Sequence, residues 1–497
     1  MDKNNLSKIR VKLWVALIQA FNEGGDVASN LVALPKKIVS QWQSELYSGA
    51  TLTEQEVNQF LLAQLGGIAS SEAGGDFNAK ITQLVAELGK LPAAERQFLT
   101  INAAACNRCD HNAIWVTNLC RGCRARPCQE ACRFGAMSMQ QGRAVIDQAK
   151  CKKCLKCVKV CSYSAIVKRL APCVDACPVG AISKDVNSIP AIDFNKCIHC
   201  GQCDAACHFG AITERSQLLK ILTKIKSGAK VIAMLAPSIV GQCDGNIRQI
   251  ASGLIKLGFY KVAEVAVGAD ETSINEAKEW HERVIEHHAP FMTTSCCTAY
   301  TELVKRHIPQ LAPLVSNTLT PMAYIARKMR ARYPDAVTVF VGPCVAKRAE
   351  CFDDPNIDAV MEYEELNACF LASGIVPSQL AEYSFEDQSS HEARNFGLTQ
   401  GVATAVAHLV TQDQNQLKPY YISGLDKLSV QQLKTFATEN KCQEGNLVEV
   451  MACRGGCVGG PHAAKPSQAV VNEVQTYAAT GASNLELMQR SAKATTS

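Results

Sequence analysis

Two stretches of the chain carry cysteines at the spacing C-x2-C-x2-C-x3-C. They read CKKCLKCVKVC and CIHCGQCDAAC. Three thiolates on one tight loop can bind three iron atoms of a 4Fe–4S cubane, while the fourth thiolate reaches a neighbouring cluster. Both stretches therefore predict iron–sulfur clusters. The expected ligands are Cys151, Cys154, Cys157, Cys161, Cys197, Cys200, Cys203 and Cys207.

Eight further cysteines lie beside these stretches, in the segments CNRC, CRGCRARPCQEAC and CVDAC. They are Cys106, Cys109, Cys120, Cys123, Cys128, Cys132, Cys173 and Cys177. The sixteen thiolates together suffice for four 4Fe–4S clusters. A zinc site at CNRC is an open alternative, because paired cysteines also bind zinc.

The crossover of the fourth ligand predicts how these thiolates combine. The four expected sets are Cys120, Cys123, Cys128 with Cys161; Cys151, Cys154, Cys157 with Cys132; Cys197, Cys200, Cys203 with Cys177; and Cys106, Cys109, Cys173 with Cys207.

Nine more cysteines lie outside this region; three of them directly follow apolar segments, and a fourth lies close behind one of these three. Cys297 follows PFMTTSC, Cys344 follows VTVFVGP, and Cys453 follows LVEVMA, with Cys457 four residues beyond. Such segments predict buried strands, and the carboxyl ends of parallel strands share one edge of a sheet. The four thiolates could therefore meet and bind one 4Fe–4S cluster. Buried structural cysteines would explain any one of them more simply.

The elements that position these thiols fall into three predicted parts. Residues 1–100 contain no cysteine, and apolar residues at helical spacing predict a small helical region of unreadable role. Residues 101–215 form an α+β ferredoxin-like domain with up to four clusters. Residues 216–497 alternate apolar strand-like segments with helical ones, which predicts an α/β domain with mainly parallel sheets.

Composition restricts the class of protein further. The chain has 497 residues and 25 cysteines, and a large chain with CxxC spacings favours metal binding over disulfides. No apolar run is long enough to cross a bilayer and no cleavable signal is apparent, so we expect a cytoplasmic protein without a membrane span.

The charge of the chain is uneven. Residues 101–215 contain 16 Lys and Arg against 8 Asp and Glu. This excess fits an acidic electron carrier as partner, or an offset to anionic clusters. Nucleic acid is disfavoured, because no nucleic-acid fold signature accompanies the charge.

Three segments carry a specific resemblance. TTSCCTAY, VGPCVAKRAE and EVMACRGGCVGG resemble, in this order, the signature segments of iron-only (FeFe) hydrogenases. The resemblance spans about residues 105–465 and indicates a divergent branch. In that family a 4Fe–4S cluster is joined through one cysteine to a two-iron unit with CO, cyanide and an azadithiolate bridge, together called the H-cluster. The resemblance implies that Cys297, Cys344, Cys453 and Cys457 hold it, with Cys457 as the bridge.

The same resemblance assigns roles around the H-cluster. Lys347 would bind one cyanide ligand, and Cys296 would be the thiol that donates protons. Further residues expected against the cofactor are Ala236, Pro237, Ser238, Gly342 and Pro343.

A proton route is also implied. GADETSINEAKEW resembles a family helix with two glutamates, which places Glu276 and Glu279 on one face. LVSNTLTP resembles the segment whose serine joins them, here Ser316. Glu350 matches another acidic position near Lys347. Surface glutamates on a solvated helix are the simpler alternative for Glu276 and Glu279.

Some positions depart from the family pattern. Thr298 stands where proline is usual, Gly342 where methionine is usual, and Thr320 begins the segment that usually reads SPQ. A methionine near the two-iron unit fills space, so we expect Gly342 to open or reshape that pocket.

The resemblance implies reversible formation of H2 from protons and electrons. Four accessory 4Fe–4S clusters would relay electrons from ferredoxin, flavodoxin or a redox partner subunit, and dedicated maturation proteins would be required. No dinucleotide fingerprint is apparent. A hydrogen sensor with low turnover, or a non-catalytic relative in iron–sulfur assembly, remains the alternative.

Overall fold

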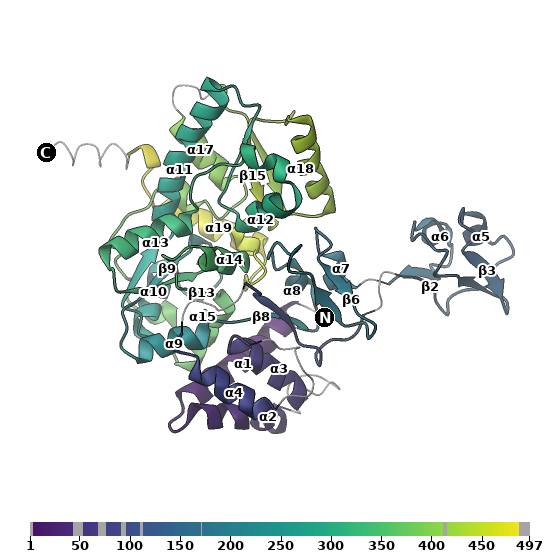
Figure 1. Ribbon diagram of the computed structural model, residues 1–497, viewed down its shortest axis with the longest axis horizontal. Helices are drawn as coiled ribbons and strands as arrows, with labels where there is room; N and C mark the ends of the chain where they lie inside the picture. The colour runs from purple at the N-terminus through teal and green to yellow at the C-terminus, as the bar shows by residue number, and fades with distance from the viewer. Residues whose placement is uncertain are drawn as a thin grey trace.

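The computed structural model describes residues 3–42, 53–67, 76–90, 96–109, 113–169, 171–410 and 415–486. Three parts are visible in Figure 1: a group of N-terminal helices, a cysteine-rich part with short strands, and a large α/β part. The α/β part carries the candidate site, and the other two parts flank it.

Two parallel sheets form the frame of the α/β part. The first has the order β10-β9-β12-β13 and the second β11-β15-β14. β9 and β15 are buried along their whole length, as expected for parallel strands covered on both faces. This confirms the prediction of an α/β fold with mainly parallel sheets. The strands are β9 (Val231–Leu235), β10 (Lys261–Glu264), β11 (Met292–Thr293), β12 (Val337–Val341), β13 (Ala359–Met361), β14 (Pro419–Ser423) and β15 (Leu447–Met451).

Helices cover these sheets (Figure 1). The α-helices are α9 (Leu218–Lys226), α10 (Ile247–Lys256), α11 (Ala266–Trp280), α12 (Thr298–His307), α13 (Pro321–Arg332), α14 (Ala346–Asp353), α15 (Tyr363–Ala372), α16 (His391–Arg394), α17 (Gly401–Leu409), α18 (Lys427–Glu439) and α19 (Ser467–Ala478). Shorter turns are η1 (Pro237–Ile239), η3 (Pro309–Leu314), η4 (Pro377–Gln379) and η5 (Cys457–Gly459), and η2 (His281–Glu286) is a π-helix that extends α11.

The N-terminal helices pack against the α/β part. They are α1 (Lys3–Asn22), α2 (Val27–Trp42), α3 (Glu54–Gln64) and α4 (Phe77–Ala86). Leu17 and Ile18 of α1 lie in the same hydrophobic cluster as Val231 and Leu366, so the two parts share one core. Among the described residues, no helix combines the length and apolar content that a membrane span needs.

The cysteine-rich part consists of short antiparallel strand pairs and single-turn helices. Its strands are β1 (Leu99–Ile101) with β8 (Ile212–Glu214), β2 (Ile114–Val116) with β5 (Ile166–Lys168), β3 (Met137–Gln140) with β4 (Arg143–Ile146), and β6 (Ile182–Lys184) with β7 (Pro190–Ile192). Its helices are α5 (Pro127–Glu130), α6 (Lys156–Val160), α7 (Pro172–Asp175) and α8 (Gln202–Ala206). The half with β2, β3, α5 and α6 projects away from the rest of the molecule (Figure 1).

Candidate active site

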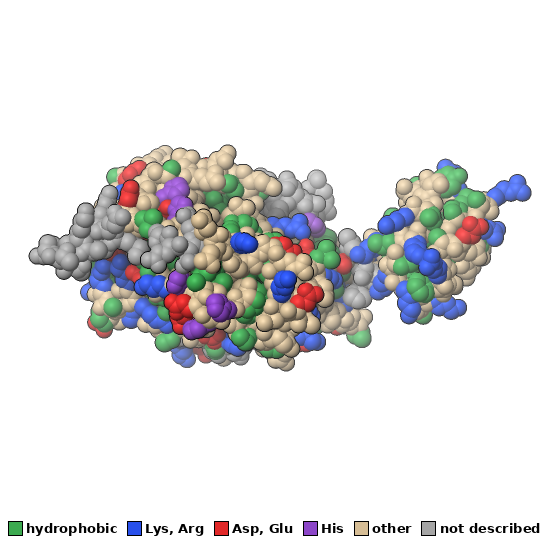
Figure 2. Space-filling model, turned by 90° about the horizontal axis from the view of Figure 1, so that it is seen from above, with side chains coloured by type: hydrophobic (Ala, Val, Ile, Leu, Met, Phe, Trp, Pro, Cys, Tyr) green, Lys and Arg blue, Asp and Glu red, His purple; other side chains and the backbone are tan. Residues whose placement is uncertain are grey.

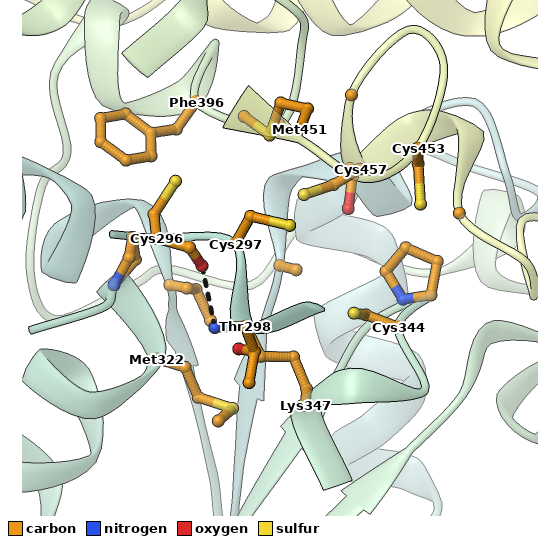
Figure 3. A pocket seen from close by; sticks show the side chains of 18 of the residues that line it. Cys296, Cys297, Thr298, Met322, Cys344, Lys347, Phe396, Met451, Cys453 and Cys457 are labelled. Atoms are coloured by element: carbon orange, nitrogen blue, oxygen red, sulfur yellow. Dashed lines mark hydrogen bonds between the residues drawn. The ribbon is translucent and has the colours of Figure 1, made fainter. Parts of the chain in front are cut away.

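The four outlying cysteines line one cavity at the ends of strands from both parallel sheets. Cys297 precedes α12, Cys344 follows β12, Cys453 follows β15, and Cys457 begins η5. Figure 3 shows their thiols arranged around a common space, with Cys296 on the other side of Cys297. Three segments that are distant in the sequence are thus brought together, as the strand pattern predicts.

The environment of these thiols fits a cluster of iron and sulfide. Burial, followed by the neighbouring Cys457, raises the pKa of Cys344 to about 12. Burial likewise raises the pKa of Cys457 to about 11. Such thiols stay neutral unless a metal displaces their protons. The backbone N–H of Ala452 donates to the Cys297 Sγ (3.4 Å), a contact of the kind that tunes ligating sulfurs. Four thiols that face one cavity therefore form a donor set that suits a 4Fe–4S cluster.

Lys347 points its ammonium group at this cavity from the first turn of α14. Its Nζ donates to the carbonyl oxygen of Cys296 (3.3 Å) and lies 2.6 Å from Glu350 Oε2. Burial disfavours the charged ammonium, but the adjacent Glu350 outweighs burial and raises the pKa of Lys347. Lys347 is therefore a fixed positive charge at the edge of the cavity.

Two threonines hold Glu350 in place. Thr298 Oγ1 donates to Glu350 Oε2 (2.5 Å), and Thr320 Oγ1 donates to Glu350 Oε1. Both threonines stand at positions that depart from the family pattern. Thr298 thus supplies a hydroxyl group where proline is usual, whereas Thr320 keeps the hydroxyl group of the usual serine.

The Cys296 thiol lies between the four cysteines and a buried carboxyl group. Glu276 is fully buried in α11, and its Oε1 accepts from the backbone N–H of Ser295 (3.1 Å). Burial raises the pKa of Glu276 to about 7. Burial, and secondly the proximity of Glu276, raises the pKa of Cys296. The structure therefore places a neutral thiol beside a carboxyl group that can change protonation near neutral pH.

A second carboxyl group continues toward the surface. Ser316 Oγ donates to Glu279 Oε2 (2.6 Å). Ser316 also lies close to Glu276, and its hydroxyl group opposes the rise that burial causes in the pKa of Glu276. Glu279 forms an ion pair with Arg283 one turn further along (2.5 Å), and both side chains are partly exposed. The structure thus brings Cys296, Glu276, Ser316 and Glu279 into one series, whose role stays a prediction.

The segment after β9 forms another wall of the cavity. Ala236, Pro237 and Ser238 all line it, and Ser238 Oγ lies 2.6 Å from Tyr363 OH. The hydrogen bond fixes the side chain of Ser238, so the short turn η1 presents a defined surface to the cavity.

The aromatic ring of Phe340 fills the space next to Gly342. A Cβ atom at Gly342 would lie 2.4 Å from Cε1 of Phe340. Phe340 and Pro343 line the cavity, whereas Gly342 itself does not. The space beside this glycine is therefore filled from within β12.

The sixteen clustered thiols form neighbouring groups. Cys106 and Cys207 both lie close enough to Cys173 and to Cys109 to affect the pKa of these two thiols. Cys177 neighbours the Cys197, Cys200, Cys203 group, and Cys161 and Cys123 neighbour Cys128. Cys132 lines a small cavity together with Cys151, Cys154 and Cys157. These neighbours fit the four expected sets, while the metal content of each set remains a prediction.

One of these groups lies against the candidate site. Cys200 lines the same cavity as Cys453 and is its electrostatic neighbour. Gly201 has φ +71°, and a Cβ there would meet Val345 and Pro461 at 2.6 and 2.7 Å. Glycine therefore permits the close approach of this loop to two segments of the site.

Four residues of the site were not predicted from the sequence. Ser295, Phe396 and Met451 surround Cys296, and a second buried carboxyl group, Glu449, accepts from the backbone N–H groups of Gln400 (2.7 Å) and Ala403 (2.9 Å). Burial raises the pKa of Glu449 to about 7. Only Ser295 had a signal that could have found it, because it directly precedes the two cysteines.

Comparison with known proteins agrees with this geometry. Residues 229–461 match the family model described as the iron-only hydrogenase large subunit, C-terminal domain, and residues 190–213 match a 4Fe–4S binding domain. The chain is 27% identical over 312 residues to iron hydrogenase 1 of Clostridium pasteurianum, a match that covers 50% of this chain and 54% of that protein.

Two further similarities were found. The periplasmic Fe hydrogenase large subunit of Nitratidesulfovibrio vulgaris is 28% identical over 370 residues, covering 63% of this chain and 85% of that protein. The solved structure of FeFe-hydrogenase HydA1 from Chlamydomonas reinhardtii has 19% identity and a TM-score of 0.43, covering 53% of this chain and 88% of that one. The sequence matches therefore show that residues 229–461 are similar to the C-terminal domain of iron-only hydrogenases, at low identity, and that residues 190–213 are similar to a 4Fe–4S binding domain.

Proposed function

We propose that this protein interconverts H2 with two protons and two electrons at an H-cluster. The observation that carries the proposal is the position of the buried Cys296 thiol. It lies between four cysteines that line one cavity and a carboxyl group whose pKa burial raises to about 7. A site of this composition has the groups that proton and electron exchange need.

The H-cluster would be held by Cys297, Cys344, Cys453 and Cys457, with Lys347 placed to hydrogen-bond a cyanide ligand. When bound, the cluster would supply the redox chemistry and the binding of hydrogen. The chain itself supplies a cavity with a mainly apolar lining and one fixed positive charge, the Lys347 ammonium group. An apolar enclosure keeps water away, and the lower dielectric constant strengthens the electrostatic interaction of that charge with a bound anion.

The proton route would run through side chains of this protein. Cys296 would exchange a proton with Glu276, whose Oε2 makes no hydrogen bond with the described residues and is free to carry it. Ser316 would pass the proton to Glu279 through its hydroxyl group, which already donates to Glu279 Oε2 at 2.6 Å. From Glu279 the partly exposed pair with Arg283 would lead to solvent.

Electrons would enter through the cysteine-rich region, residues 101–215, which we assign to up to four accessory 4Fe–4S clusters. The proximity of Cys200 and Cys453 supports a transfer from the last accessory cluster to the site. The donor would be ferredoxin, flavodoxin or a partner subunit, and maturation proteins would insert the two-iron unit. We expect this chemistry in the cytoplasm, where cysteines with CxxC spacings stay reduced and can bind metal.

Substitution of the proposed proton donor tests the function. We expect Cys296→Ala to lower H2 turnover at least a hundredfold while iron content is unchanged, because the thiol is not a cluster ligand. Cys351→Ala is the matched control, since Cys351 is an equally buried thiol in α14 that does not line the cavity. Equal turnover of C296A and the parent protein would contradict the proposal. Absence of turnover in the fully matured parent protein would instead favour a sensor or an assembly role.

A further inference from the structure

A group of charged side chains is buried where the three parts of the molecule meet. Asp204 lies in α8 of the cysteine-rich part, Glu214 ends β8, and His462 follows the Cys457 loop by five residues. Their exposed fractions are 2%, 5% and 4%. None of the three lines the cysteine cavity, and the proposed hydrogen chemistry does not use them.

Three atoms of this group point at one another. His462 Nε2 lies 2.7 Å from Glu214 Oε1 and 3.1 Å from Asp204 Oδ2. In spite of these short distances, His462 Nε2 and Glu214 Oε1 make no directed hydrogen bond with the described residues. Donor atoms bound to one metal ion at about 2.0–2.2 Å lie roughly 3 Å apart, so the spacing is that of a ligand set.

The outer atoms of the same side chains are occupied. His462 Nδ1 lies 2.9 Å from Glu362 Oε2. Arg348 Nε donates to Glu214 Oε2 (2.7 Å), and Arg10 donates to Asp204 Oδ1. Metal-binding histidines and carboxylates are typically oriented by such outer partners. Of the inner atoms, Asp204 Oδ2 also accepts a long hydrogen bond from Arg10 Nη1 (3.5 Å).

The charge balance of the group favours a divalent cation. Five buried or nearly buried carboxyl groups face two guanidinium groups: Asp204, Glu214, Glu362, Glu364 and Glu365 against Arg10 and Arg348. A divalent ion beside a neutral imidazole supplies two positive charges to this group, one more than protonation of His462 would supply. Uncompensated buried charge is costly, so the divalent ion is the better solution.

We propose that Asp204, Glu214 and His462 bind one divalent first-row transition metal ion, with zinc the expected occupant. One imidazole nitrogen and two carboxylate oxygens are ordinary zinc ligands. The ion ties α8, which contains Cys203 and directly precedes Cys207, to the segment that follows Cys457. It thereby fixes the position of the last accessory cysteine group relative to the candidate active site.

The test uses the full-length protein, isolated without oxygen from cells supplied with Zn²⁺. Metal analysis should find about one zinc per chain in addition to iron. X-ray absorption at the zinc edge should show only nitrogen and oxygen neighbours, at about 2.0–2.1 Å. Zinc bound at CNRC would instead show sulfur at about 2.3 Å, so the two sites are distinguishable without any substitution.

Substitutions assign the site. His462→Gln and Glu214→Gln should each lower bound zinc at least tenfold with unchanged iron content. His408→Gln is the matched control, since His408 also pairs with a carboxylate (Glu392, 2.7 Å) but, among the described residues, forms no ion pair with a second carboxylate. The proposal is overturned if the parent protein binds no zinc, if its zinc has only sulfur neighbours, or if H462Q and E214Q retain it.

Discussion

Glu276 is the residue on which the proposed proton route depends most. Its carboxyl group is fully buried, and of the charged groups around Cys296 it raises the pKa of that thiol most. We predict that Glu276→Gln lowers H2 turnover by a factor of about 10²–10⁴, because glutamine keeps the shape but cannot exchange a proton. Turnover with a reduced viologen dye measures this. Glu271→Gln, at an exposed position of the same helix α11, should have no effect, and an equal loss in both variants would refute the assignment.

The protonation state of Glu276 gives a second prediction. Since burial raises its pKa to about 7, the carboxyl group is neutral below that pH and ionised above it. Infrared difference spectra recorded from pH 5 to pH 9 should show a carboxylic acid band that disappears as the pH rises through about 7. The band should be missing in the E276Q protein. If the E276Q spectrum keeps the band, another group, Glu449 first, is responsible.

At the scale of residues, the positions of the cysteines around the cavity could be predicted from the sequence. The residues that hold the neighbouring polar side chains in place could not. The spacing of Cys453 and Cys457, and the strands before Cys297 and Cys344, give a direct signal. Thr298 and Thr320 read only as departures from the family pattern. Their hydrogen bonds to Glu350 connect positions that are 52 and 30 residues apart, and such pairing depends on the packing of α12, α13 and α14.

At the scale of elements, the end of β12 shapes the cavity through one close contact. The ring of Phe340 occupies the space beside Gly342, so Gly342→Ala would place a methyl group within 2.4 Å of a ring carbon. We predict a loss of about 1–3 kcal/mol, which corresponds to several degrees in Tm, from this overpacking.

A double-mutant cycle separates this contact from other effects. Phe340→Leu should remove most of the clash, so the double variant F340L/G342A should be more stable than the sum of the two single changes implies. Thermal unfolding followed by circular dichroism gives the four midpoints. Additive losses would show that the ring does not constrain Gly342.

The contact between α11 and α13 sets the position of Glu276. A Cβ atom at Gly268 would lie 2.1 Å from the carbonyl oxygen of Pro321, so the two helices approach at this glycine. Gly268→Ala should therefore displace α11 and lower turnover without loss of iron. A G268A protein with unchanged turnover and unchanged Tm would show that the helix position is not critical.

The elements themselves followed from the sequence better than their packing did. Apolar runs predicted β9, β12 and β15, because parallel strands are buried on both faces. The predicted boundary near residue 100 separates regions of different composition, yet α1 shares a core with β9 and α15. That contact joins residues more than 200 positions apart, and helical periodicity carries no information on the partner of a helix.

At the scale of the whole molecule, basic side chains are concentrated in the projecting half of the cysteine-rich part, where we propose that a redox partner docks. Residues 113–169 contain twelve Lys and Arg against two Asp and Glu. Figure 2 shows these basic side chains spread over the projecting part. For an acidic carrier, we predict that the rate of electron transfer falls roughly tenfold between low ionic strength and 0.5 M salt, because salt screens the attraction.

Neutralising part of this surface should have a similar effect. Lys152→Gln with Lys153→Gln should slow transfer at low salt and weaken its salt dependence. Lys434→Gln with Lys441→Gln, on the exposed side of the α/β part, is the control of equal charge change. Stopped-flow mixing with the reduced carrier gives the rates. Equal slowing in both double variants would argue against docking at the projecting part.

The central claim is that the four cysteines around the cavity hold a hydrogen-reactive H-cluster. The most direct measurement is an infrared spectrum of anaerobically matured protein, recorded under argon and then under hydrogen. The account predicts sharp CO and cyanide bands that shift when hydrogen is admitted. Absence of such bands, in protein with full iron content and competent maturation, would contradict it.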